Sequence, residues 1–420
     1  MPVSTRIYAS CALAFGGQPA VDDLKASGYS TVLVWSVHVD AYGSLYLNDT
    51  LFVFRGAYKE TQPMDLPARL AQLRTAGVEV LFSVGAGETS DFTNIGKLLH
   101  GGVPGPGNPL YDNFNALRCA MLGAGSDIDG IDLDNEDNVD PSVMVNFGRM
   151  LHHIGYPHVT LCPYDDLPVW TDTLTQLNKS PGVGFVNAVH LQCYSGGSGN
   201  AEKVQSWQNM ITKTGSAGRC LLIPGLATVQ PHKGPWWYKA RPGRNVGTRS
   251  GVAMDGRADW SRYLRTEYYL DERAALQGAQ RYRSATFFFY CHDLVDLGPG
   301  KRFQAGDAVF FSGEPWWCRA PQCAAFSLSL RCRDSYNPDN LGACPSDLQR
   351  QFKTWSAVKP RLQGGFIWFY DSVVQCLLSG CCGGTEPKPV TTAGAYRDAI
   401  VNGLSPSGRG SRPLSKRRHR

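Results

Sequence analysis

Short apolar segments rich in β-branched and aromatic residues recur along the chain, and most are followed by a stretch whose apolar positions have helical spacing. These patterns predict strands over 7–15, 31–37, 78–85, 127–134, 158–163, 185–194, 219–227 and 365–370. They predict helices over 66–76, 111–122, 141–154, 170–177, 201–214, 347–362 and 395–404, and a loop or hairpin over 38–62. Strands that alternate with helices are typical of a parallel sheet, because parallel neighbours need a crossover connection between them.

The number and order of these elements predict an α/β protein built as a closed (β/α)8 TIM barrel. An open doubly wound sheet would give a similar pattern, but no G-x-G-x-x-G turn follows any predicted strand. We expect the barrel to comprise residues 1–227 and 347–404. The stretch 228–346 is too long for a barrel loop, so we interpret it as a Cys-rich insertion that contains a small domain over 283–345.

The net charge of +5 comes from the end of the chain. Six cations and no acids lie in the last twelve residues, so the remainder has a charge of 5 − 6 = −1. We expect 405–420 to be a disordered, solvated tail, with contact to a nucleic acid, an anionic surface or an import receptor as the alternative. The body shows no nucleic-acid signature. No run of 18 apolar residues exists, so we expect no membrane span, and we expect a monomer.

Thirteen cysteines are many for this length, and eight of them cluster between 291 and 382. Clustering favours disulfides in an oxidising compartment over zinc, because no paired C-x2-C spacing occurs. We expect neither a metal nor a cofactor. The cysteines that lie in apolar settings are expected to be buried thiols: Cys11, Cys119, Cys162, Cys193 and Cys220. No signal peptide is visible, although the clustered cysteines favour an extracellular location.

The segment 129–136 holds four acids, and three of them alternate at the end of the fourth predicted strand. Side chains two residues apart share a strand face, so Asp132, Asp134 and Glu136 would project together. Such crowding favours the protonated form of at least one carboxyl, as an acid catalyst of glycoside cleavage requires. A solvated acidic turn or a calcium loop is the alternative, but Asp137 stands where an EF-hand needs glycine.

The sequence Asp-Gly-Ile-Asp-Leu-Asp-Asn-Glu over 129–136 resembles the D-G-x-D-x-D-x-E signature of glycoside hydrolase family 18, the chitinase family. Three other segments are similar to conserved strand ends of that family. They are Ser83-Val84-Gly85-Ala86, Gln192-Cys193-Tyr194 and Gly364-Gly365-Phe366-Ile367-Trp368. The resemblance covers about 6–227 and 347–404, and it implies a TIM barrel with its site at the carboxyl ends of the strands.

The resemblance also implies a role for each matching residue. Glu136 would protonate the glycosidic oxygen, and the 2-acetamido group of the substrate would attack the anomeric carbon in place of an enzyme carboxylate. Asp134 would orient that group and stabilise the oxazolinium ion, and Asp132 would share a proton with Asp134. Tyr194 would bind the acetamido oxygen, and Trp368 would form an apolar floor beneath the sugar.

Several other residues are weaker candidates. Gln192 is either a substrate-binding residue or a hydrogen-bonding residue of the barrel interior, and Tyr164 could line the cleft. Asp129, Ser83, Gly85, His38 and His190 are expected to be structural.

The insertion has a signal of its own. The segment from Phe303 to Val309, followed by Gly313, Trp316 and Trp317, is similar to the pattern of small chitin-binding modules, which stack aromatic rings on sugars. The alternative is a disulfide-tied domain with these two tryptophans in its core.

These expectations combine into a retaining endo-hydrolase of β-1,4-linked N-acetylglucosamine polymers, whose partner is chitin or a chito-oligosaccharide. Two alternatives remain open. One is an endo-β-N-acetylglucosaminidase acting on N-glycans or on peptidoglycan-related glycans. The other is a non-catalytic, chitinase-like lectin, although such proteins usually lack the acid that Glu136 would supply.

Overall fold

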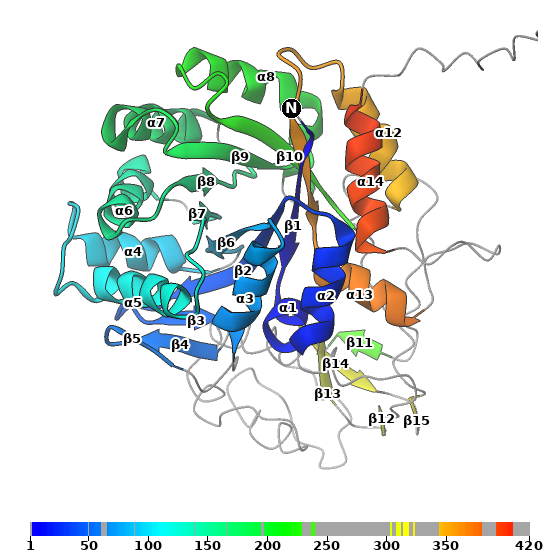
Figure 1. Ribbon diagram of the computed structural model, residues 1–420, viewed down its shortest axis with the longest axis horizontal. Coiled ribbons are helices and arrows are strands. Elements are labelled where there is room, and N and C mark those ends of the chain that lie inside the picture. The colour runs from blue at the N-terminus through cyan, green and yellow to red at the C-terminus, as the bar shows by residue number, and fades with distance from the viewer. Residues whose placement is uncertain are drawn as a thin grey trace, which may run out of the picture.

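Eight parallel strands close into a barrel in the computed structural model (Figure 1). The structure describes residues 2–48, 50–59, 65–87, 89–137, 139–165, 167–194, 197–228, 344–379 and 392–405, and five short strands between 237 and 323. Strand β1 pairs with both β2 and β16, which closes the ring. The barrel strands, in order around it, are β1 (Ser4–Ala9), β2 (Thr31–Val39), β6 (Glu79–Val84), β7 (Gly130–Leu133), β8 (Val159–Leu161), β9 (Val186–Gln192), β10 (Leu221–Ala227) and β16 (Gly364–Trp368). The predicted (β/α)8 barrel is therefore confirmed.

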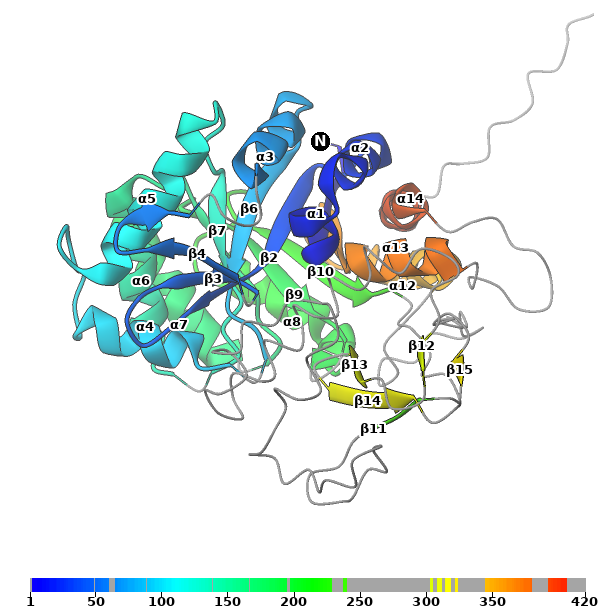
Figure 2. The ribbon, with the colours of Figure 1, turned by 90° about the horizontal axis from the view of Figure 1, so that it is seen from below.

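Helices surround this barrel, as the view from below in Figure 2 also shows. They are α1 (Cys11–Phe15), α2 (Gly17–Ser27), α3 (Leu66–Thr75), α4 (Asp91–Leu99), α5 (Pro109–Gly123), α6 (Pro141–Ile154), α7 (Leu167–Leu177), α8 (Asn200–Lys213), α12 (Pro345–Trp355), α13 (Tyr370–Ser379) and α14 (Ala393–Leu404). All seven predicted helices are present, although α12 ends at Trp355 and not at 362, whereas α1, α2, α4 and α13 were not predicted. A π-helical turn, η1 (Asn178–Gly182), follows α7.

The predicted hairpin over 38–62 is confirmed. Strand β2 continues into an antiparallel extension made of β3 (Leu45–Leu47), β4 (Thr50–Phe54) and β5 (Ala57–Tyr58).

The prediction of one strand over 7–15 is wrong in its second half, because α1 begins at Cys11. The amides of Ser10 and Ala12 donate to the two carboxylate oxygens of Asp371, at 2.8 and 2.7 Å. Asp371 lies on α13, 361 residues further along the chain from Ser10. A long-range hydrogen-bonding partner therefore satisfies the amides at the start of this helix, where local side chains usually do so.

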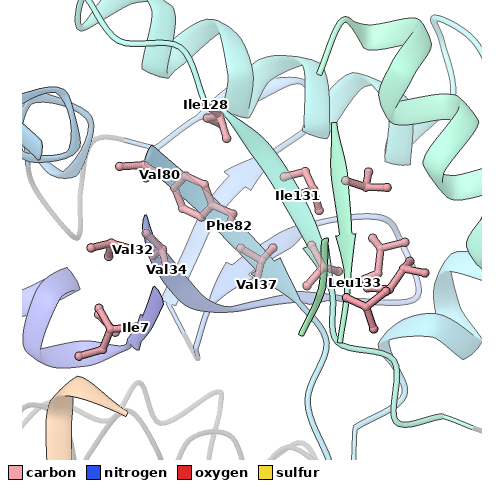
Figure 3. Close-up of a cluster of buried hydrophobic side chains, with 14 of the residues drawn as sticks. Ile7, Val32, Val34, Val37, Val80, Phe82, Ile128, Ile131 and Leu133 are labelled. Carbon is pink, nitrogen blue, oxygen red and sulfur yellow. The ribbon is translucent and has the colours of Figure 1, made fainter. Parts of the chain in front are cut away.

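Side chains of the barrel strands alternate between two apolar clusters. The outer cluster packs between the strands and the helices, and Figure 3 shows part of it, including Val32, Phe82 and Ile131. The inner cluster fills the barrel and includes Leu33, Leu81 and Phe366. This period of two places every second strand residue inside the barrel, as strand geometry requires.

Gly225 of β10 provides the space for the Phe366 ring inside the barrel, since a Cβ atom at position 225 would overlap that ring. We expect Gly225→Ala to lower the free energy of unfolding by about 1–3 kcal/mol, because a packed interior cannot absorb the extra methyl group. Chemical denaturation measures this change. The matched control is Gly123→Ala at the end of α5, where a Cβ atom meets nothing within 4 Å. An equal loss of stability in both variants would contradict this account of the barrel packing.

Most of the insertion lies outside the described residues. Short strands within it form two small antiparallel sheets, and they are β11 (Trp237–Lys239), β12 (Phe303–Gln304), β13 (Ala308–Phe311), β14 (Glu314–Cys318) and β15 (Gln322–Cys323). Its assignment as a separate sugar-binding domain stays a prediction, as does the disordered tail. Within the part of the chain that the structure describes, no helix is long and apolar enough to span a membrane.

The expected buried thiols are confirmed for Cys162 and Cys220. Two expectations were wrong: Cys119 is exposed on α5, and Cys11 is buried but disulfide-bonded. Cys193 is buried as expected. Apart from Cys344, which is half-buried, the side chains of the clustered cysteines lie outside the described residues.

Candidate active site

The three alternating acids follow one another along β7 and the loop after it. Asp132 lies within the strand and is fully buried in the barrel. Asp134 comes just after the strand, and its amide donates to the carbonyl of Val84 at 2.9 Å, which continues the parallel pairing with β6. Gly85 follows with a φ of +99°, and a Cβ atom there would overlap the carbonyl of Asp134. Glycine at position 85 therefore permits the close approach of the segments that follow β6 and β7, as the sequence predicted.

Four side chains from four different strands donate hydrogen bonds to Asp132. Oδ2 accepts from the hydroxyls of Tyr8 and Ser83 at 2.9 and 2.7 Å. Oδ1 accepts from Thr160 at 2.5 Å and contacts Nδ1 of His190 at 2.8 Å. Burial acts to raise the pKa of Asp132, but His190 and the hydroxyl donors outweigh burial and hold that pKa below its ordinary value.

Asp134 lies between two fixed donors. The indole nitrogen of Trp35 donates to Oδ2, and the amide nitrogen of Gln192 donates to Oδ1, both at 3.0 Å. Burial, together with the negative charges of Glu136 and Asp132, raises the pKa of Asp134 well above its ordinary value. We infer that Asp134 keeps its proton at pH values where an exposed aspartate has lost it.

Glu136 is connected to Asp134 through Gln192, whose Nε2 also donates to Oε1 of Glu136 at 3.2 Å. Burial raises the pKa of Glu136, and the hydrogen bond from Gln192 offsets only part of that effect. A Cβ atom at Gly87 would lie 2.7 Å from Oε2 of Glu136, so the loop after β6 packs closely on this carboxyl. Glu136 thus has the raised pKa that suits a general acid.

Tyr194 and Trp368 stack beside the acids. Their ring centroids are 5.9 Å apart with an interplanar angle of 19°. The edge of Trp35 meets Trp368 at 4.5 Å and 90°, and Tyr8 lies 5.4 Å from it. Burial and nearby negative charges raise the pKa of the Tyr194 phenol well above its ordinary value, so it is a neutral hydrogen-bond donor. The two rings offer an aromatic surface next to a proton donor.

The structure therefore brings together the five principal predicted residues and one of the weaker candidates, Gln192; the five are Asp132, Asp134, Glu136, Tyr194 and Trp368. Tyr164 is half-buried, and its pKa is raised by burial and by the charge of Glu136, which places it near this group. Asp129 is structural as predicted, because it accepts from the amide of Val80 at 2.8 Å and pairs with Arg74 at 2.9 Å. The side chains of Trp316 and Trp317 lie outside the described residues.

Sequence reasoning missed several residues of this group. Ser83 and His190 were expected to be structural, yet both contact Asp132 directly. Tyr8, Trp35 and Thr160 were not singled out, and Cys162, expected only as a buried thiol, has its Sγ atom 3.2 Å from the Tyr8 hydroxyl. The alternation of side chains along each strand could have identified them. A polar residue that shares a strand face with inward-pointing residues also faces the barrel interior. His38, by contrast, is structural as predicted and bonds Ser36 and Asp91.

No cluster of three or more His, Cys, Asp or Glu side chains suited to a metal ion occurs among the described residues.

Comparisons with known proteins give similar structures only. No protein-family model matches the sequence, and no curated protein matches it significantly. A GH18 chitinase from Pseudoalteromonas aurantia is 14% identical, with a TM-score of 0.40 over 54% of this chain and 81% of the other. A chitinase from Bacteroides thetaiotaomicron is 10% identical, with a TM-score of 0.47 over 97% and 98%. The spore cortex-lytic enzyme SleL from Bacillus megaterium is 11% identical, with a TM-score of 0.42 over 88% and 71%.

Proposed function

We propose that this protein is a retaining glycoside hydrolase of the family 18 type that cleaves β-1,4-linked N-acetylglucosamine polymers, with the 2-acetamido group of the substrate as nucleophile. The observation that carries the proposal is the arrangement of the acids. Two carboxyls with raised pKa values, Asp134 and Glu136, bind one amide nitrogen of Gln192 beside the rings of Tyr194 and Trp368.

This arrangement disfavours the two common schemes for glycoside cleavage. Inverting enzymes keep their carboxyls roughly 6.5–9.5 Å apart so that water fits between them and the sugar. Asp134 Oδ1 and Glu136 Oε1 lie 3.0 and 3.2 Å from one nitrogen, which is too close for that scheme. A retaining enzyme with its own nucleophile needs an ionised, accessible carboxylate. Asp134 is buried with a raised pKa, and Asp132 is fully buried, so the nucleophile is best supplied by the substrate.

The first step of the proposed reaction breaks the glycosidic bond. Glu136 gives its proton to the glycosidic oxygen, and the leaving sugar departs as a neutral alcohol. The acetamido oxygen forms a bond to the anomeric carbon, which creates a positively charged oxazolinium ion. Glu136 and Asp134 then hold one proton fewer, so their negative charge lies beside the positive ion. Preorganised charge of this kind is among the largest contributions to catalysis.

The second step regenerates the enzyme. Water attacks the anomeric carbon, its proton returns to Glu136, and the bond to the acetamido oxygen breaks. Two displacements at one carbon give net retention of configuration. Trp368 would lie beneath the sugar ring, and Tyr194 would donate to the acetamido oxygen and hold it in line for attack.

A comparison of three substrates tests this proposal: a chitin hexamer, an N-glycosylated protein and peptidoglycan. We expect cleavage of the hexamer to shorter N-acetylated products, detected by mass spectrometry. Cleavage of only the glycoprotein or the peptidoglycan would point to the related glycosidase activities. Binding of the hexamer without cleavage of any substrate would instead identify a lectin and contradict the proposed activity.

Tyr194→Phe tests the role of the phenol. We expect kcat on the chitin hexamer to fall by about 10–100-fold, because one hydrogen bond to a group of changing charge contributes about 1.5–3 kcal/mol. Tyr156→Phe is the matched control, since its buried hydroxyl donates to the carbonyl of Phe114 at 2.9 Å. The control should lose stability but keep kcat. A Tyr194→Phe enzyme with unchanged kcat would remove Tyr194 from the mechanism.

A further inference from the structure

A chain of buried polar groups lies behind Asp132, and the reaction scheme above does not use it. Arg6 and His190 are 4% and 0% exposed and lie inside the barrel on β1 and β9. Nη1 of Arg6 lies 2.8 Å from Nε2 of His190, and Nδ1 of His190 lies 2.8 Å from Oδ1 of Asp132. Buried charged groups are rare unless they are paired, so this chain requires an explanation.

We propose that Arg6 and His190 are positioning residues that hold Asp132 as a permanent carboxylate anion, so that the proton that moves during the reaction is carried by Asp134 and Glu136. This assignment differs from the expectation that Asp132 and Asp134 share a proton. It deepens the proposed function, and its kinetic consequences rest on that function.

The direction of the hydrogen bonds follows from the chemistry of arginine. A guanidinium group only donates, so Nε2 of His190 must accept and carries no proton. Nδ1 therefore carries the imidazole proton and donates it to Asp132. Burial lowers the pKa of His190, in agreement with a neutral ring. The fixed positive charge of Arg6 thus lies one neutral imidazole away from Asp132.

The other contacts of Asp132 also favour the anion. An ionised carboxylate accepts hydrogen bonds and cannot donate them, whereas a protonated one must find an acceptor. Tyr8, Ser83, Thr160 and His190 all approach Asp132 as donors, two on each oxygen. Charge-assisted bonds of this type are stronger than neutral ones. These four donors occupy both oxygens of Asp132, so the proton of Asp134 is not needed to complete its hydrogen bonding.

The titratable groups around these buried residues come from six strands of the barrel or from the residues next to them: β1, β6, β7, β8, β9 and β10. Glu79 on β6 adds a negative charge that favours the charged form of Arg6, while burial of Arg6 acts against it. The remaining groups are Tyr8 on β1, Asp134 and Glu136 after β7, His158 and Cys162 at the two ends of β8, Tyr194 after β9 and Cys220 before β10. Arg6 and Asp132 attract each other, and burial lowers the pKa of His158 to about 4, so Arg6 is the permanent cation of this group.

The consequence concerns the moving proton. With Asp132 fixed as an anion, its charge discourages ionisation of Asp134, and only Asp134 and Glu136 can exchange protons during the reaction. The amide of Gln192 holds these two carboxyls together. Loss of Arg6 or His190 would let Asp132 take up a proton at higher pH. The negative charge that discourages ionisation of Asp134 would then be lost.

Carboxyl carbon NMR of the wild-type protein tests the proposal without any need for activity. The protein is labelled at the aspartate carboxyl carbons, and the resonance of Asp132 is identified by its absence from Asp132→Asn. We expect this carbon to keep its carboxylate shift from pH 8 down to about pH 4. A protonation midpoint above about pH 5 in the wild-type protein would overturn the proposal.

Two substitutions at His190 provide a matched pair. Gln can accept from Arg6 through its oxygen and donate to Asp132 through its nitrogen, so His190→Gln should keep the wild-type titration. His190→Leu removes both contacts and should raise the midpoint of Asp132 by about 1–2 pH units. The acid limb of the kcat profile on the chitin hexamer should move upward by the same amount in the leucine variant alone.

The two readouts separate failure of this proposal from failure of the proposed function. If the wild-type protein cleaves no chitin hexamer but Asp132 stays ionised, the proposed function is wrong and the assignment of Arg6 and His190 holds. If the hexamer is cleaved and the glutamine and leucine variants titrate alike, the assignment is wrong. Should the leucine variant not fold, the wild-type and glutamine titrations still decide the question.

Discussion

Glu136→Gln is expected to lower kcat on a chitin hexamer by about 10⁴-fold, the upper range for loss of a general acid. Glutamine keeps the size of the side chain and can still accept the hydrogen bond from Gln192, but it has no acidic proton to give. Binding of the hexamer, measured by calorimetry, should persist, because the aromatic surface of Tyr194 and Trp368 is unchanged. Loss of kcat without loss of binding is the signature of a group that acts in the transition state.

The matched control for this variant is Asp137→Asn. Asp137 is the next residue, its Oδ2 accepts from the amide of Thr93 at 2.8 Å, and it acts on Glu136 only through its charge, which adds to the effect of burial on the pKa of Glu136. The control should lose some stability and keep kcat within a few-fold of the wild type. Turnover by Glu136→Gln within tenfold of the wild type would remove Glu136 as the acid.

Asp134→Asn has the second largest expected effect, a loss of about 10³-fold in kcat. When Glu136 gives up its proton, Asp134 can share its own proton with the new carboxylate and so spread the negative charge beside the oxazolinium ion. Asparagine cannot share a proton in this way, although its oxygen can still accept from Trp35. Steady-state kinetics on the chitin hexamer measures the effect.

The control is Asp129→Asn, just before the start of β7. It removes a charge that is paired with Arg74 at 2.9 Å. We expect this variant to have a lower midpoint of unfolding and a normal kcat. Equal losses of kcat in Asp134→Asn and Asp129→Asn would contradict a catalytic role for Asp134. They would mean that both losses come from destabilisation of this segment.

The barrel could be predicted because its strands and helices carry strong apolar patterns. Helix α6 was predicted with its exact ends, since Asp140 caps it and Gly155 ends it in a left-handed conformation. Helix α1 was not, because the sequence Cys-Ala-Leu-Ala-Phe is apolar throughout and gives no period. The carboxylate that holds its start, Asp371, is distant in sequence and close only in the folded chain.

The candidate site shows the same limit. Asp132, Asp134 and Glu136 could be predicted because they stand at alternate positions of one short segment. The donors around Asp132 come from β1, β6, β8 and β9, and each strand supplies one of them. The sequence does not show which partner such a residue will contact, because the partners lie on other strands and come together only in the closed barrel. His190 is the clearest example, because both its ring nitrogens are engaged, one by Arg6 and one by Asp132.

The stereochemistry of cleavage tests the central claim most directly. Proton NMR at the start of the reaction would follow the new reducing end released from a chitin hexamer, beside a hexamer from which the acetyl groups have been removed. Substrate-assisted retention predicts that the β-anomer appears first from the acetylated hexamer and that the deacetylated hexamer is not cleaved. Initial release of the α-anomer, or equal cleavage of the two hexamers, would contradict the account.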